Sequence, residues 1–158
     1  MNLFTAKPTL AHAHCDVPCG IYDPVEAQTQ ALSVTRFLDL LAEYEGAELG
    51  LADHARIARL VANKETHAAA VKDAVVVIWG DYFKPNHFAD HPELHTLTHD
   101  IMQTASKCKQ GLDPADGRKL VELINQFAEV FWRSKGVATE TVTVPYEPKL
   151  DVVRPVAG

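Results

Sequence analysis

The chain has 158 residues, 47% of them hydrophobic and 23% charged, which predicts a single globular domain with one core. Its formal net charge of −6 argues against a general nucleic-acid or anionic-membrane binder, and no apolar run approaches the roughly 18 residues of a membrane span. Three cysteines, an odd number, do not fit a secreted disulfide scaffold, so we expect a protein of the reducing cytoplasm.

Residues 1–13 come before any periodic pattern. They end in Ala11-His12-Ala13, which has the small-x-small form of a cleavage site. However, Lys7 is their one positive charge and Pro8 interrupts their few apolar residues, so no secretory signal is predicted. We expect a removable leader of another kind.

Four amphipathic helices follow, at residues 24–45, 51–80, 91–109 and 114–135, with apolar side chains recurring every three or four positions. Asp23-Pro24 and Asp113-Pro114 are typical helix starts. Residues 81–88 are predicted to form a loop, because Pro85 bars helix continuation. The expected fold class is all-α, an up-and-down four-helix bundle preceded by an irregular N-terminal metal hook.

The last segment, residues 136–158, alternates β-branched residues and then becomes rich in proline. It is too short for a domain. We expect it to be either disordered or laid along a neighbouring surface.

The most informative stretch is residues 14–22, His14-Cys15-Asp16-Val17-Pro18-Cys19-Gly20-Ile21-Tyr22, called the hook below. A zinc knuckle or a local thiol pair is the simplest interpretation. Yet no second zinc half-site is evident, and three residues separate the cysteines where a redox C-x-x-C has two. Neither alternative explains a histidine directly before the first cysteine.

A free amine at residue 14 would explain that adjacency. The amine, the Cys15 backbone nitrogen and the Cys15 sulfur would form two fused five-membered chelate rings, and the Cys19 sulfur would close a square plane. Nickel and copper favour such tetragonal N/S ligation more than zinc does. The imidazole of His14 would reach the axial position.

The hook resembles the nickel-binding hook of the nickel superoxide dismutases, in the pattern His-Cys-Asp-x-Pro-Cys-Gly-x-Tyr. A distant stretch, Trp79-x-Asp81-Tyr82-Phe83-Lys84-Pro85, also resembles that family. The resemblance covers roughly residues 14–135. It implies a leader at 1–13, a hook plus four-helix bundle at 14–135 and an added tail at 136–158.

The resemblance also implies the ligands and the activity. His14 would supply the terminal amine and an axial imidazole, Cys15 its amide nitrogen and thiolate, and Cys19 a thiolate, with one nickel ion per subunit. The implied reaction converts superoxide to oxygen and hydrogen peroxide by one-electron Ni(II)/Ni(III) cycling. The implied assembly is a homohexamer, activated when a processing protease cleaves before His14.

Three more residues belong to the implied site. Tyr22 and Tyr82 would flank the approach to nickel, and Asp16 would shape the same wall. The family usually braces its axial histidine with a glutamate and an arginine, and Gln30 and His67 align with those places here.

Other readings of the chain stay open. The hook could belong to a non-catalytic nickel or copper carrier, or could be only a docking segment of a helical assembly protein. His87, His91, His95 and His99 are expected to be surface or interface histidines.

Overall fold

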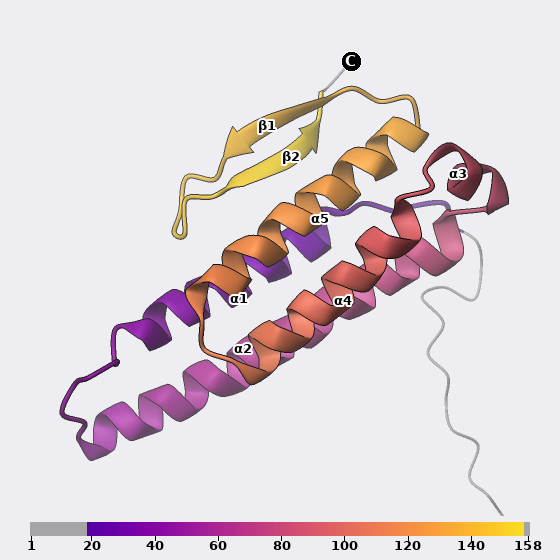
Figure 1. The fold of residues 1–158 in the computed structure, drawn as a ribbon. Helices are drawn as coiled ribbons and strands as arrows, with labels where there is room; N and C mark the ends of the chain where they lie inside the picture. Colours follow the sequence, from indigo (N-terminus) through magenta and orange to yellow (C-terminus); the bar gives the residue numbers. More distant parts are fainter. Residues whose placement is uncertain (1–18, 157–158) are drawn as a thin grey trace, which may run out of the picture.

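The computed structural model describes residues 19–156. Its four long helices are α1 (Val25–Ala42), α2 (Leu51–Val77), α4 (Leu94–Gln110) and α5 (Pro114–Ser134). Helix α1 packs against α2 and α5, and α4 packs against the same two helices, so the four enclose one core (Figure 1). The predicted antiparallel bundle is confirmed, with helix ends within about one turn of those expected from the sequence.

Local capping explains where two of these helices begin. The carboxylate of Asp23 accepts a hydrogen bond from the Val25 backbone N–H at 2.8 Å, and that of Asp113 accepts one from Ala115 N–H at 2.9 Å. Each bond satisfies a first-turn donor that has no partner inside its helix. Both Asp-Pro pairs therefore start helices as predicted.

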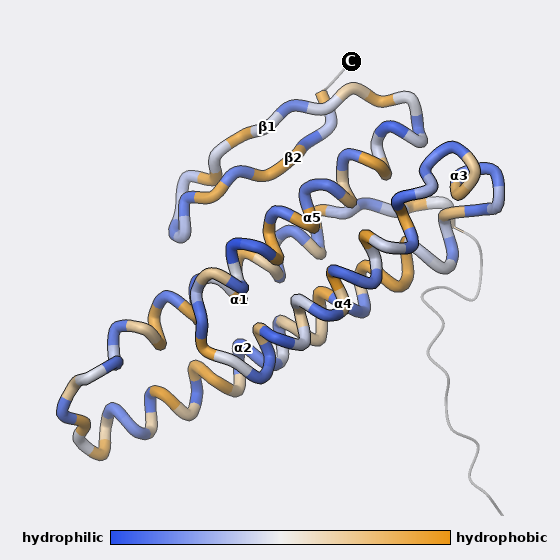
Figure 2. Tube along the Cα trace, viewed as in Figure 1, coloured by the Kyte–Doolittle hydropathy of each residue, from blue (hydrophilic) through white to orange (hydrophobic). Residues whose placement is uncertain are grey.

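The core lies between the four helices, and hydrophobic residues alternate with polar ones along each of them (Figure 2). Fully buried side chains include Leu38, Leu94, Leu120, Phe127 and Phe131. Helices α1 and α5 approach closely at Gly117, where an added Cβ would lie 3.0 Å from atoms of Thr35 and Leu38. Because that spacing is below ordinary van der Waals contact, we infer that a side chain at residue 117 would push the two helices apart.

The loop predicted at residues 81–88 is wrong. The chain continues from α2 into a π-helical turn, η1 (Ile78–Tyr82), and then forms a short helix, α3 (Pro85–Asp90). Pro85 occupies the first helical position, where a missing N–H costs nothing. It therefore begins a helix as well as ending the previous one.

The tail forms a β-hairpin of β1 (Thr139–Thr143) and β2 (Asp151–Pro155), paired antiparallel with Thr141 opposite Val153. Val144, Val152 and Val153 are buried against the bundle. Of the two alternatives for residues 136–158, the second holds for the described part, because the hairpin lies along α5 and α1 of its own chain (Figure 1).

Buried and half-buried amides attach the hairpin. The Gln28 side-chain amide donates to the Val153 carbonyl at 2.8 Å, and Asn125 donates to the Asp151 carbonyl at 2.8 Å while accepting from Val153 N–H at 3.2 Å. None of the helices within residues 19–156 is both long enough and apolar enough to cross a bilayer.

Candidate metal centre

The described part of the hook is residues 19–22, and it leads directly into α1. The predicted residues His14, Cys15 and Asp16 lie outside the described residues. Cys19 is exposed, and Gly20 has φ of +70° with open space around its α-carbon. A left-handed backbone of this kind favours glycine, so Gly20 lets the chain turn sharply beside the cysteine.

The structure brings Tyr22 and Tyr82 together. Their ring centroids are 5.7 Å apart, with the ring planes inclined by 50°. Tyr22 stands just before α1, whereas Tyr82 ends the π-helical turn after α2. Because α1 and α2 are antiparallel neighbours, the start of one and the end of the other meet at one end of the bundle, called the hook end below. The predicted pair of tyrosines beside the hook is consistent with this geometry.

Side chains from α3 and α5 fix the ring of Tyr82. His87 of α3 stacks on it at 5.3 Å with an interplanar angle of 11°, and Phe131 of α5 lies 4.8 Å away. The Lys84 backbone N–H donates to His87 Nδ1 at 3.0 Å, which holds the imidazole in place. The short helix α3, missed by sequence reasoning, therefore helps to orient a predicted site residue.

Sequence reasoning also missed Ser134 and Lys135, at the end of α5. Ser134 Oγ lies 2.9 Å from the phenol oxygen of Tyr82, and Lys135 Nζ lies 5.0 Å from the centroid of its ring. A cation above an aromatic face is attracted by the ring quadrupole. No local signal marks these residues, since serine and lysine are common where helices end and only the bundle topology places them near residue 82.

Gln30 and His67 meet across the α1–α2 interface. His67 Nδ1 contacts Gln30 Oε1, and the imidazole lies 5.4 Å from the ring of Phe37. A hollow of about 480 Å³ at the hook end is lined by Glu26 and Ala70. Gln30 follows Glu26 by four residues on α1, and His67 precedes Ala70 by three on α2. The pair therefore lies one helical turn further from the hook end, along the same interface.

The four histidines near α3 and α4 do not behave alike. His95 and His99 are exposed as expected, but His91 is only 9% exposed and its side chain is part of the interior. His95 stacks on Phe88 at 4.2 Å. Within residues 19–156, no three His, Cys, Asp or Glu side chains gather as a potential metal site.

Cys108 is buried in α4, at the opposite end of the bundle from the hook. Burial is the main cause that raises the pKa of its thiol from 9.0 to about 12, with Asp116 adding to the effect. Thiolates, not thiols, bind metals and act as nucleophiles. Cys108 is therefore a core side chain.

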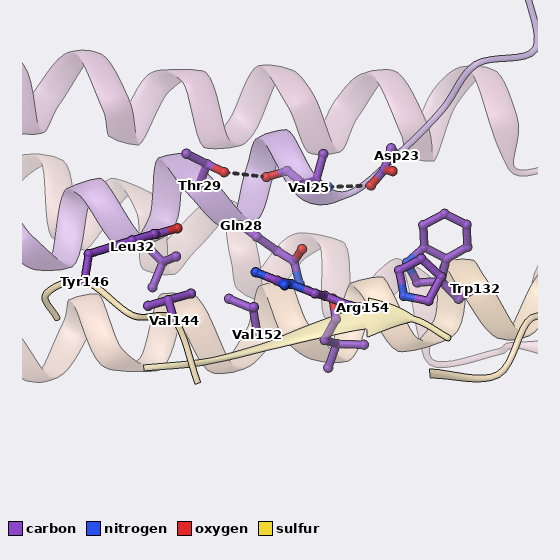
Figure 3. A pocket seen from close by; sticks show the side chains of 12 residues that line it. Asp23, Val25, Gln28, Thr29, Leu32, Trp132, Val144, Tyr146, Val152 and Arg154 are labelled. Carbon is purple, nitrogen blue, oxygen red and sulfur yellow. Dashed lines mark hydrogen bonds between the residues drawn. The ribbon is translucent and has the colours of Figure 1, made fainter. Parts of the chain in front are cut away.

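A second hollow near the hook end lies beneath the hairpin (Figure 3). It has a volume of about 320 Å³ and is lined by α1, α5, β2 and the turn before β2, with Asp23, Trp132 and Arg154 around it. Asp23 also lines the larger hollow beside α2. The segment between the hook and α1 therefore separates two cavities.

Comparison with known proteins identifies relatives over most of the chain. The family model of the nickel-containing superoxide dismutases matches residues 9–135. The nickel superoxide dismutase of Streptomyces coelicolor is 41% identical over 134 residues, covering 85% of this chain and 96% of the relative. That of Streptomyces seoulensis is 39% identical over the same length and coverage.

Solved structures agree. A crystal structure of a nickel-containing superoxide dismutase, with nickel ligated as in the oxidised state, superposes with a TM-score of 0.69 at 38% identity, covering 78% of this chain and 99% of that one. The hairpin at residues 139–155 lies beyond the family match, which ends at 135. The chain belongs to the family of nickel-containing superoxide dismutases.

Proposed function

We propose that this protein disproportionates superoxide to oxygen and hydrogen peroxide with one nickel ion per subunit, held by His14, Cys15 and Cys19. A terminal amine, a backbone amide nitrogen and two thiolates form a donor set that suits nickel. The observation that carries the proposal is the contact between Tyr22 and Tyr82, whose ring centroids lie 5.7 Å apart. Tyr22 follows Cys19 by three residues. Family membership supports the choice of metal and substrate.

The numbering of related enzymes supports a mature chain that begins at His14. Solved variants of these enzymes carry replacements of the first residue, a histidine, of the third, an aspartate, and of the ninth, a tyrosine. Counted from His14, this chain has Asp16 third and Tyr22 ninth. We therefore propose that a protease removes residues 1–13 and so creates the terminal amine.

Bound nickel would supply the one-electron exchange with superoxide. The two half-reactions together convert two superoxide anions and two protons to one oxygen and one hydrogen peroxide molecule. Tyr22, Tyr82 and Asp16 would narrow the approach, exclude bulky anions and position water that carries protons. Lys135, with its ammonium 5.0 Å from the Tyr82 ring centroid, adds positive charge on a chain of net charge −6.

We further propose that the hook end is completed by neighbouring subunits in a homohexamer. Ile21 and Val25 line the hollow beside α2 and are 76% and 55% exposed, which is unusual for large apolar side chains so close to a site. We place the assembly in the cytoplasm, where thiols of the hook stay reduced. Sedimentation of the processed protein tests the assembly.

The decisive experiment combines intact mass, metal analysis and stopped-flow consumption of superoxide on protein isolated from its own cells. We expect loss of residues 1–13, about one nickel per subunit and rapid consumption against a metal-free control. Cys15→Ser and Cys19→Ser should abolish nickel binding and turnover. Cys108→Ser is the matched control and should retain both.

Two outcomes would contradict the proposal. Nickel binding without superoxide consumption would favour a nickel or copper carrier. Full activity in protein that keeps residues 1–13 would exclude ligation by a terminal amine at His14.

A further inference from the structure

The hydroxyl groups of Ser134 and Tyr82 have a defined donor and acceptor order. Ser134 Oγ donates its hydrogen to the Phe131 carbonyl oxygen at 2.7 Å, and the same Oγ lies 2.9 Å from the phenol oxygen of Tyr82. A serine hydroxyl has one hydrogen and two acceptor lone pairs. Since that hydrogen already serves Phe131, the hydrogen in the second bond comes from Tyr82.

From this order we propose that Ser134 is a positioning residue for Tyr82: it holds the phenol hydrogen, so that the phenol oxygen acts as an acceptor for a proton-carrying water at the hook. The role rests on the proposed function, in which Tyr82 stands beside nickel. Ser134 itself touches no reacting atom in this scheme.

The packing around Tyr82 explains why a serine is needed as well. His87 and Phe131 fix the plane of the ring, and Lys135 lies over its face. None of these contacts sets the torsion of the phenol O–H bond, which rotates about the C–O axis. Only a hydrogen-bond partner at the phenol oxygen selects one direction, and Ser134 is that partner among the described residues.

The donor order has a chemical consequence. A phenol whose hydrogen is engaged offers only lone pairs on its remaining side. An anion such as superoxide needs a donor, whereas a water can donate to Tyr82 and keep its second hydrogen for transfer. The arrangement therefore favours delivery of protons through water over direct binding of the anion by Tyr82.

Raman spectroscopy of the metal-free full chain tests the hydrogen bond without any catalysis. The intensity ratio of the tyrosine Fermi doublet is low when a phenol donates strongly and high when it only accepts. The difference between wild type and Tyr82→Phe isolates Tyr82 among four tyrosines. We expect a low ratio in wild type, a higher ratio in Ser134→Ala and a low ratio again in Ser134→Thr.

The matched control is Ser33→Ala. Ser33 also donates from a helix to a carbonyl, that of Thr29 at 3.0 Å, but among the described residues its hydrogen-bond partner is not a tyrosine. It should leave the doublet unchanged. An acceptor-type ratio for Tyr82 in wild type would overturn the proposal even if no Ser134 variant folds.

Kinetics of the nickel-loaded protein tests the positioning role. Ser134→Ala should lower kcat/KM about fivefold, the rate equivalent of one ordinary hydrogen bond, and Ser134→Thr should restore it. In a Tyr82→Phe background, Ser134→Ala should have no further effect, because the two residues act as one unit. Equal effects in both backgrounds would overturn the proposal.

Failure of the proposed function gives a different result. A wild-type protein that binds nickel but does not consume superoxide would refute that function, and the catalytic meaning of Ser134 with it, even where the doublet shifts as expected. Active wild type with an unchanged doublet in Ser134→Ala would refute the positioning role alone.

Discussion

Lys64 should be one of the most sensitive positions for stability, although it is charged. Its side chain is 1% exposed in α2, and Nζ donates to the carbonyl oxygens of Cys108, Lys109 and Gly111 at 2.7, 2.9 and 2.5 Å. These carbonyls lie at the end of α4, where intrahelical partners run out and the helix dipole is negative. Three acceptors require the three hydrogens of the charged ammonium, even though burial lowers the pKa of Lys64.

Replacement by methionine keeps the apolar stem and removes the donors. The Cys108 carbonyl is left in a buried site, at a cost of about 1–3 kcal/mol, while the other two carbonyls are partly exposed and recover some hydration. We expect Lys64→Met to lower the free energy of unfolding by about 2–3 kcal/mol, because the desolvation of the ammonium is relieved at the same time. For a chain of this size the melting temperature should fall by about 4–12 °C.

Lys72→Met is the matched control. Lys72 also projects from α2 toward α4, but its Nζ donates to a single hydroxyl, Ser106 Oγ, at 2.5 Å in a half-buried site. It should cost less than about 1 kcal/mol. Urea unfolding followed by circular dichroism measures both variants. If Lys64→Met costs no more than Lys72→Met, the three carbonyl bonds do not support the end of α4, and the reasoning fails.

Three further predictions concern other parts of the fold. The Cys108 thiol has a pKa of about 12 in the folded chain and 9.0 in the unfolded chain, so the unfolded chain loses its proton first as the pH rises. Between about pH 8 and pH 10, the free energy of unfolding of wild type should therefore fall by about 1.4 kcal/mol more than that of Cys108→Ala, as measured by urea titration. Gln30→Ala should lower the free energy of unfolding by about 1 kcal/mol, because it removes the partner of His67. Calorimetry should show this loss, whereas metal analysis should show unchanged nickel content. Asn125→Ala should speed hydrogen exchange of the Val153 amide, which donates to Asn125 Oδ1; unchanged exchange would mean that the hairpin does not depend on this amide.

The sequence predicted the bundle because its signals are local. Helix periodicity and the two Asp-Pro pairs act within a few residues, and the structure uses them at Asp23 and Asp113 as expected. The same local rule was applied incompletely at Pro85. Proline was read there as a helix breaker, although it also suits the first position of a new helix.

The hairpin could not be predicted with the same ease. Its strands are five residues each, and its two-stranded sheet is stable only because Val152 and Val153 are buried against helices far away in sequence. Likewise, residue identity alone does not mark Lys64 as a buried cap. Its role depends on the position of α4, which is set by tertiary packing.

The candidate site shows the same division. The hook and Tyr82 are recognisable from motif resemblance, whereas Ser134 and Lys135 acquire a role only because α5 ends where α2 ends. Antiparallel topology therefore supplies the missing part of the site. It also separates the site from Lys64, which lies midway along α2 and acts on the C-terminal end of α4, so Lys64→Met should change stability without changing turnover per folded, nickel-loaded subunit.

The last turn of α5 connects the family core to the added hairpin. Phe131 lies 4.8 Å from the Tyr82 ring and 4.9 Å from the Trp132 ring, and Trp132 lines the cavity beneath the hairpin. Ser134 follows two residues later and holds the phenol of Tyr82. The hairpin and the turn of α5 that carries Ser134 therefore border the same cavity. A segment outside the family match thus lies close to the helical turn that contacts Tyr82.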